Sequence, residues 1–237
     1  MLKNNMLRSL IEKLIRNLKR DSLYELDKSY SMKQLTFILW YRFAQLVRGF
    51  FLKMRIYSSG IVFCGRRVVV EHGYQLRVGR NLIIEDNVYI NALSQNGISV
   101  GNNVTIAKFS VLSSTGVIAR KGTGIWIGNN SAIGAQSFLG GQGGISIGND
   151  VIMGPQVKIF SENHNYNMSG VLIREQGESR KGVSIGNNCW IGAGVIILDG
   201  VAIADGCVIA GGSVITKSVD RNSIVAGVPG KVMGTRN

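Results

Sequence analysis

An aliphatic side chain recurs every six residues through the C-terminal part of the chain. The recurrence is unbroken at Ile185, Ile191, Ile197, Ile203, Ile209 and Ile215. A period of six fits neither an amphipathic helix nor a single strand, but it is typical of short strands joined by tight corners in a solenoid. The residue after the aliphatic is often small, as expected where the chain bends sharply. The pattern predicts a mainly β, three-sided parallel β-helix whose coils bury their aliphatics against each other.

The same register continues backwards with a few interruptions and gives nineteen positions in all, each of them aliphatic or Met. The remaining positions are Val78, Ile84, Ile90, Val100, Ile106, Leu112, Ile118, Ile127, Ile133, Leu139, Ile147, Met153 and Ile159. At three sides per turn these positions make about six coils, enough stacked repeats for a continuous core. We therefore expect the β-helix over residues 59–217, with a C-terminal tail over 218–237.

The register is interrupted where the chain is expected to leave the coils. Three short, Gly-rich departures are predicted to be corner loops, at 94–97, 120–124 and 141–144. The largest interruption separates Ile159 from Ile185 by 26 residues where six are expected. Residues 160–182 must therefore leave the coil and return, and a long loop on a rigid scaffold is a common place for function. This loop contains His164, one of only two histidines.

Residues 1–58 have a different pattern, with the 3.6-residue period of amphipathic helices. One apolar stripe covers residues 6–18, and a second apolar run over 32–57 is rich in Phe, Trp and Tyr. Arg42 and Arg48 lie near the centre of the second run, and each would be costly inside a bilayer. The segment is therefore predicted to be α-helical and not to span a membrane.

The net charge of +13 is concentrated in this helical segment. Residues 1–58 hold twelve Lys and Arg and four Asp and Glu, which leaves eight of the thirteen positive charges there. Basic helices rich in aromatic side chains lie flat on anionic membranes. Alternatively, their apolar faces pack on each other and cap the open end of the β-helix, and one hairpin could do both. Nucleic-acid binding is disfavoured because the aromatics lie on apolar stripes, apart from spread basic residues.

The three cysteines argue for reduced thiols. Cys64, Cys189 and Cys207 are an odd number in a chain in which no export signal is visible, so we expect a cytoplasmic protein, peripheral at the inner membrane if its helices bind lipid. Cys189 and Cys207 are one full turn apart and are expected to fill space on adjacent coils. Because there are only two histidines, a three-His metal site is hard to build and no metal is expected.

Four segments resemble one branch of a known family. They are 153–159 (MGPQVKI) with His164 five residues later, 189–192 (CWIG), 213–217 (SVITK) and 226–232 (AGVPGKV). They are similar to the sugar and antibiotic O-acetyltransferase branch of the hexapeptide-repeat acyltransferases, which includes galactoside and maltose acetyltransferases and enzymes that modify polysaccharide precursors. The resemblance covers roughly residues 60–237. It implies a left-handed β-helix, a homotrimer with sites between subunits, and acetyl-CoA as the donor.

The chemistry of acetyl transfer favours His164 as the catalytic base. A base must remove the hydroxyl proton as the oxygen attacks the thioester, and an imidazole suits neutral pH. In the family the matching histidine has this role; the alternative is an ordinary surface histidine. A base works better when its second ring nitrogen is held by an acceptor. Glu162 is the nearest candidate in sequence, although a backbone carbonyl would serve equally well.

The resemblance also implies the contacts to coenzyme A. Trp190 would wall the site, unless it is an exposed aromatic at a subunit interface, and the Ala193 N–H would stabilise the oxyanion. The further implied contacts are Gly211 to the pantetheine amide, Thr216 and Lys217 to the nucleotide end, and Lys231 to a phosphate.

Two positions depart from the family pattern. Gly134 stands where some sugar acetyltransferases have an Asn that faces the acceptor, and Asp220-Arg221 replaces a common Pro pair. Because Gly134 lacks a polar side chain, the family's contact to the acceptor sugar does not carry over, and the identity of the acceptor is left open. We expect acetyl transfer to a sugar hydroxyl on a polysaccharide or lipid-linked saccharide precursor. The alternatives are an N-acetyltransferase for an amino sugar and a non-catalytic, membrane-associated scaffold.

Overall fold

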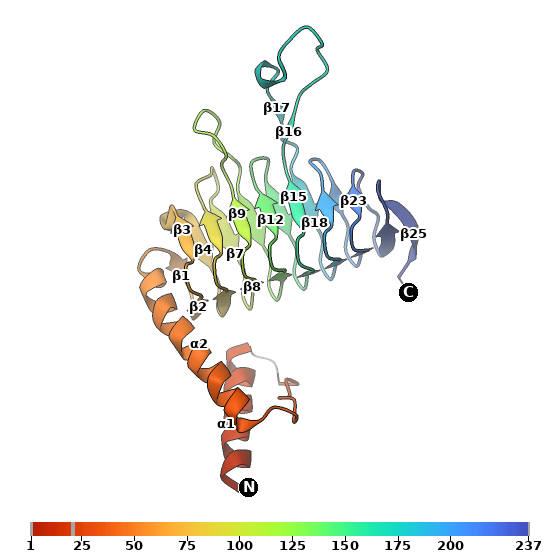
Figure 1. Ribbon diagram of the computed structural model, residues 1–237. Helices are drawn as coiled ribbons and strands as arrows, with labels where there is room; N and C mark the ends of the chain where they lie inside the picture. The colour runs from red at the N-terminus through yellow and green to blue at the C-terminus, as the bar shows by residue number, and fades with distance from the viewer. Residues whose placement is uncertain (1, 20–21, 237) are drawn as a thin grey trace.

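The computed structural model describes residues 2–19 and 22–236, in which two helices precede a long stack of three-sided coils (Figure 1). Helix α1 covers Leu2–Lys19 and α2 covers Met32–Lys53. A capping box starts α2: the Ser31 hydroxyl accepts from the Gln34 N–H, and the Gln34 side chain accepts from the Ser31 N–H. Neither described helix is long and apolar enough to cross a membrane.

The coils form three parallel sheets, which we name A, B and C in the order in which each coil visits them. Sheet A contains β1 (Tyr57–Ser58), β4 (Leu76–Val78), β7 (Ile98–Val100), β10 (Ile125–Ile127), β13 (Ile145–Ile147), β18 (Val183–Ile185) and β21 (Ala202–Ile203). Sheet B contains β2 (Val62–Cys64), β5 (Leu82–Ile84), β8 (Thr105–Ile106), β11 (Ala132–Ile133), β14 (Ile152–Met153), β19 (Trp190–Ile191), β22 (Val208–Ile209), β24 (Ser223–Ala226) and β25 (Lys231–Thr235). Sheet C contains β3 (Val69–Glu71), β6 (Tyr89–Asn91), β9 (Val111–Ser113), β12 (Phe138–Gly140), β15 (Lys158–Phe160), β20 (Ile196–Ile197) and β23 (Val214–Ile215).

The described residues contain seven coils, one more than the spacing predicts, because β1–β3 form a first coil before Val78. The short helix η1 (Gly73–Gln75) interrupts the six-residue spacing between this coil and the next. At the other end, β24 and β25 extend sheet B through the segment 218–237.

The core is a column of the register side chains. Eighteen of the nineteen predicted positions are buried, none more than 6% exposed, and they belong to one continuous cluster. The exception is Ile118, which is fully exposed, so its assignment to the core was wrong. Ile118 lies in the loop between β9 and β10, where the chain has left the coil. It was assigned to the core because it follows Leu112 by six residues, but no coil buries it.

The chain leaves the coils at one kind of corner. Each predicted loop, including the long one, lies between a sheet C strand and the next sheet A strand, so all of them project from the same edge (Figure 1). The corner between sheets A and B is instead closed by a ladder of side-chain bonds between coils. Asn102 donates to Asn129, Asn129 to Asn149, and Asn149 to Asn187. We name the edge between sheets C and A the loop edge.

Helix α2 docks on the first coil through its C-terminal half. A Cβ atom at Gly49 would lie 1.8 Å from the Val62 carbonyl oxygen, so the backbones of α2 and β2 are in direct contact. Arg48 Nε donates to the carbonyls of Cys64 (2.9 Å) and Gly65 (3.1 Å), and Leu52 joins the coil core. The start of α2 and most of α1 extend away from the coils (Figure 1), and the C-terminal end of α1 touches them where the Asn81 side chain donates to the Leu18 carbonyl.

Candidate active site

The long loop rises from the loop edge as a two-stranded stalk. Strands β16 (Asn163–His164) and β17 (Glu178–Ser179) are antiparallel, and His164 lies opposite Glu178. At the tip, the Gln176 side chain bonds to both backbone groups of Met168 and to the Val171 carbonyl. The His164 side chain is exposed on this stalk. The candidate base therefore sits on a short ordered ladder, and its imidazole is open to an approaching molecule.

The root of the stalk is fastened to the loop between β9 and β10 on the same edge. The Arg180 side chain is only 9% exposed; its Nε donates to Glu162 (2.8 Å), and its Nη1 donates to the carbonyls of Arg120 and Lys121 (3.3 Å each). Arg120 in turn pairs with Glu178 at 2.7 Å. This hydrogen bond from Arg120 lowers the pKa of Glu178, with smaller contributions from Arg180 and His164. The loop between β9 and β10 thus holds the returning strand of the stalk, and Arg180 ties that strand to Glu162 at the start of the outgoing strand.

A third attachment joins the end of the loop to the next coil. The Asp199 carboxylate accepts from the N–H groups of Lys181 (2.9 Å) and Gly182 (2.8 Å) and from the Ser179 hydroxyl (3.3 Å). These bonds hold the end of the returning strand against the coil stack. The loop therefore starts and ends on fixed points.

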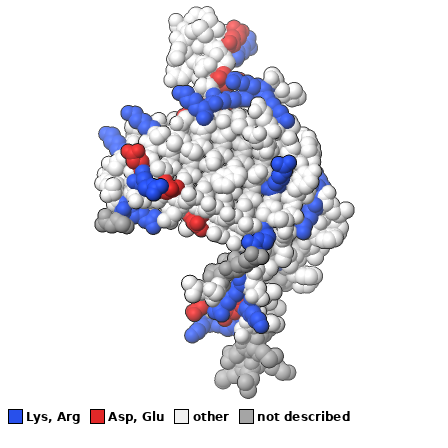
Figure 2. Space-filling model, turned by 180° about the vertical axis from the view of Figure 1, so that it is seen from behind, with Lys and Arg blue, Asp and Glu red and all other residues white. Residues whose placement is uncertain are grey.

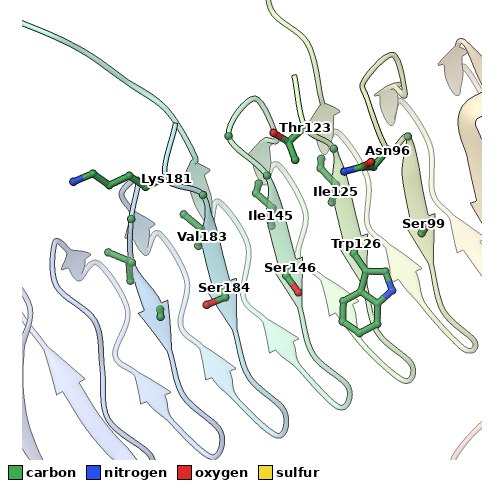
Figure 3. A pocket seen from close by; sticks show the side chains of 18 residues that line it. Asn96, Ser99, Thr123, Ile125, Trp126, Ile145, Ser146, Lys181, Val183 and Ser184 are labelled. Carbon is green, nitrogen blue, oxygen red and sulfur yellow. The ribbon is translucent and has the colours of Figure 1, made fainter. Parts of the chain in front are cut away.

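A groove of about 510 Å³ lies on sheet A beside the root of the stalk. It crosses five neighbouring strands, and the outward residue of each one lines it: Ser99, Trp126, Ser146, Ser184 and Ala202. In Figure 3 the Trp126 ring stands out from β10, while Asn96, Thr123 and Lys181 lie along the edge of the groove nearest the loops. Trp126 is 47% exposed. An exposed indole beside hydroxyl, amide and ammonium groups can bind a polar ring such as a sugar.

Sequence reasoning missed this groove and also the role of Arg180. The groove had a usable signal: Trp126 precedes the register residue Ile127, just as Trp190 precedes Ile191, and that position points outward in every strand. The contacts of Arg180 had no such signal, because its partner carbonyls lie about sixty residues away in the chain.

The residues proposed to bind coenzyme A fall into two groups. Trp190 is 56% exposed on sheet B, and Ala193 follows it at the corner between sheets B and C. Gly211 lies at the same corner one coil later, and the N–H of Gly212 donates to the Ala193 carbonyl (2.8 Å). These three residues share one edge of the coil stack.

The second group lies at other places. Thr216 and Lys217 follow β23 at the loop edge, which also bears His164, and Lys231 begins β25. Sheet C separates the loop edge from the edge of Trp190 and Ala193. A single chain therefore does not bring the candidate base together with the residues expected to hold the thioester.

Glu162 has a different partner from the one expected. Its carboxylate accepts from Arg180, while the acidic residue directly across the ladder from His164 is Glu178. The role of Glu162 in orienting His164 stays a prediction. Within residues 2–19 and 22–236 there is no group of three His, Cys, Asp or Glu side chains placed to hold a metal ion.

The cysteines lie inside the coils. Cys64, Cys189 and Cys207 are free and buried, and burial raises the pKa of each thiol. The Sγ atoms of Cys189 and Cys207 donate to the carbonyls of Ala204 (3.2 Å) and Asp220 (3.1 Å). These thiols fill space in the core, away from the loop edge.

Comparison with known proteins agrees with the repeat. Residues 182–217 match the family described as bacterial transferase hexapeptide (six repeats), and residues 124–154 match the hexapeptide repeat of succinyl-transferase. A protein of Dictyostelium discoideum named as an acetyltransferase is 47% identical over 90 residues, which are 38% of this chain and 46% of that protein. The galactoside O-acetyltransferase of Lactococcus lactis is 33% identical over 85 residues, 36% of this chain and 40% of that enzyme. The matched region thus spans less than half the length of these curated relatives.

The whole architecture also has a counterpart among solved structures. A variant of AntD, an N-acyltransferase from Bacillus cereus in complex with dTDP and coenzyme A, superposes with a TM-score of 0.54 at 22% identity, covering 88% of this chain and 91% of that one. At this identity the likeness is one of fold. The six-residue spacing, the three parallel sheets and the two matched segments agree. The chain contains hexapeptide repeats, has the left-handed parallel β-helix fold, and is similar to proteins named as acetyltransferases.

Proposed function

We propose that this protein is an acetyl-CoA-dependent O-acetyltransferase that acts on a sugar hydroxyl of a polysaccharide or lipid-linked saccharide precursor. The observation that carries the proposal is His164, exposed on a fastened stalk beside a groove that contains an exposed indole and hydroxyl groups. The name of the Lactococcus lactis relative, a galactoside O-acetyltransferase, and the coenzyme A in the AntD complex support it. The proposed location is the cytoplasm, at the inner membrane.

In the proposed reaction His164 acts as the general base. Its neutral imidazole takes the proton from the sugar hydroxyl while the oxygen attacks the thioester carbonyl. The Ala193 N–H donates to the oxyanion that forms. Collapse of the tetrahedral intermediate breaks the carbon–sulfur bond, and the departing thiolate takes the proton back from the imidazolium. The products are an acetyl ester and coenzyme A, and no metal is involved in any step.

The separation of the two groups of site residues supports a site shared between copies. We propose a homotrimer in which the loop edge of one chain faces Trp190, Ala193 and Gly211 of another. Trp190 and its neighbour in the ladder, Ile152, are 56% and 59% exposed, an apolar surface suited to an interface.

Mixed trimers test this arrangement. Chains carrying His164→Ala and chains carrying Trp190→Ala are each expected to have little activity. If each site takes its histidine from one chain and its tryptophan from another, random mixing of equal amounts restores about a quarter of the sites. Sites built within one chain would leave the refolded mixture as inactive as its parents.

The base is tested by substitution of His164. His164→Ala is expected to lower kcat by about 10²–10⁴-fold with acetyl-CoA binding unchanged. The matched control is His72→Asn, because the other histidine has a left-handed backbone (φ 53°) that Asn tolerates, and its ring contacts only the first coils. An active His164→Ala enzyme would disprove the proposed role.

The leading alternative is an N-acetyltransferase acting on an amino sugar, and the fold likeness to AntD, an N-acyltransferase, is the observation that favours it. An acceptor screen that pairs each sugar with its amino analogue separates the two reactions. A non-catalytic scaffold is the other alternative. It predicts that titration of the protein with acetyl-CoA in a calorimeter produces no saturable heat.

A further inference from the structure

Helix α2 carries an apolar face that no described part of the chain covers. Its residues are spaced three or four apart and so share one side of the helix. We name them the α2 face: Phe37, Trp40, Phe43, Val47, Phe50, Phe51 and, at the C-cap, Met54. Each is between 45% and 78% exposed. Soluble proteins rarely expose so many large apolar side chains in one patch without a binding partner.

The coil stack fixes the direction in which the α2 face points. On the opposite side of the helix Gln45, Gly49 and Leu52 are buried, and Arg48 bonds to two carbonyls of the first coil. The helix therefore cannot turn its apolar side inward without breaking these contacts. The α2 face is held pointing away from the coils.

The charge around the α2 face selects the kind of partner. No Asp or Glu occurs between Lys28 and Val70, whereas Lys28, Lys33 and Lys53 are exposed at the two ends of the helix. Seen from behind in Figure 2, Lys and Arg predominate over Asp and Glu on the visible surface, the helical part included. A second copy of the same face would bring like charges together, whereas anionic lipid headgroups would neutralise them.

We propose that the α2 face binds the surface of an anionic membrane. In this arrangement α2 lies parallel to the bilayer, Trp40 and the Phe rings enter the boundary between headgroups and acyl chains, and the Lys ammonium groups contact lipid phosphates. The distribution matches an interfacial helix, since aromatic side chains occupy one side and basic side chains flank it. The inference goes beyond the proposed reaction, because it requires no catalytic activity.

Vesicle sedimentation of the full-length protein tests the proposal. The probes are phosphatidylcholine vesicles with and without 30 mol% phosphatidylglycerol. The wild type is expected to pellet with the anionic vesicles and to stay in solution with the neutral ones. Trp40→Ser/Phe50→Ser should lower the partition coefficient at least about tenfold, because two large apolar side chains no longer enter the lipid. Lys33→Gln and Lys53→Gln should each lower it about fivefold.

The matched control is Val232→Ser/Met233→Ser, which removes two similarly exposed apolar side chains from β25 at the far end of the coils. It is expected to bind vesicles like the wild type. All variants should keep the wild-type unfolding temperature, because the replaced side chains are exposed.

Three results would overturn the proposal. The first is equal pelleting with both kinds of vesicle or with neither. The second is equal binding by the helix variant and the β25 control. The third is a change in oligomer mass on Trp40→Ser/Phe50→Ser, measured by sedimentation velocity without lipid, since it would show that another copy covers the α2 face. Loss of acetyl transfer in any variant has no bearing on these outcomes.

Discussion

Arg180 is expected to control the order of the loop that carries His164. Its guanidinium joins three points: the Glu162 carboxylate at the start of the stalk, and the carbonyls of Arg120 and Lys121 in the loop between β9 and β10. Arg180→Ala removes all of these bonds at once. None of the atoms involved belongs to the column of buried aliphatics, so the change should act on the loop alone.

The size of the effect follows from these contacts. A hydrogen bond between charged groups contributes about 1.5–3 kcal/mol, and each long bond to a carbonyl about 0.5 kcal/mol. Glu162 is 26% exposed, so water recovers part of the loss after the arginine is removed. We expect local opening of the loop to become easier by about 2–3 kcal/mol, roughly a 30- to 160-fold larger open population. The unfolding temperature of the coils should hardly change.

Hydrogen exchange followed by mass spectrometry measures this quantity directly. Peptides covering 160–182 should exchange roughly 30- to 160-fold faster in Arg180→Ala, while peptides from the coils keep their rates. Arg174→Ala is the matched control. Arg174 lies in the same loop, its side chain is 80% exposed, and its contact with Glu175 is long, at 3.8 Å, so its loss should have little effect. Unchanged exchange in the loop would refute the reasoning, and so would faster exchange throughout the coils.

Three further predictions concern the core, the thiols and pH. Leu112→Ala should lower the free energy of unfolding by about 2–5 kcal/mol, whereas Ile118→Ala should change it by less than about 0.5 kcal/mol, as chemical denaturation can show. The three buried thiols should resist alkylation at pH 8 in the native protein and react fully in denaturant, because burial raises their pKa. Because the folded-state pKa of Glu178 is lowered, its pairing with Arg120 should stabilise the loop above about pH 4.5 and be lost as pH falls further; susceptibility of the loop to pepsin should then rise in the wild type but not in Glu178→Gln.

Much of the fold could be predicted because every coil obeys the same constraint. Each coil packs its inward side chains against those of the next coil, so the register residue must be apolar wherever the coil is regular, and eighteen such positions are buried. The prediction failed at Ile118 because Leu112 and Ile127 are fifteen residues apart, which no count in sixes can bridge. The first coil lies almost wholly inside the predicted range 59–217 but was not counted in the register for a related reason, since η1 shifts the spacing between Val70 and Val78.

The site was predictable only in part. The extra length of 160–182 and the histidine within it are properties of the local sequence, and both led to the loop. The pairing of His164 with Glu178 and the contacts of Arg180 depend on how strands and loops meet in space. Residue spacing does not predict such contacts between distant segments. Glu162, the nearest acidic residue in sequence, was therefore chosen as the partner of His164, although Glu178 lies opposite the histidine.

Direct contacts tie successive coils together at two of the three corners, and every long loop emerges at the third. At the corner between sheets B and C, successive backbones nearly touch: a Cβ atom at Gly134 would lie 2.0 Å from the Gly154 carbonyl oxygen. The same contact leaves no room for an Asn at Gly134, the position where some sugar acetyltransferases carry one. At the corner between sheets A and B, the bonds from Asn102 through Asn187 tie each turn to the next, so an added residue would break the ladder. The loop edge also has close backbone contacts, since a Cβ atom at Gly143 would lie 1.8 Å from the Ser161 carbonyl oxygen. The chain nevertheless lengthens there by whole loops, and His164, which reaches beyond its own coil, projects from this edge.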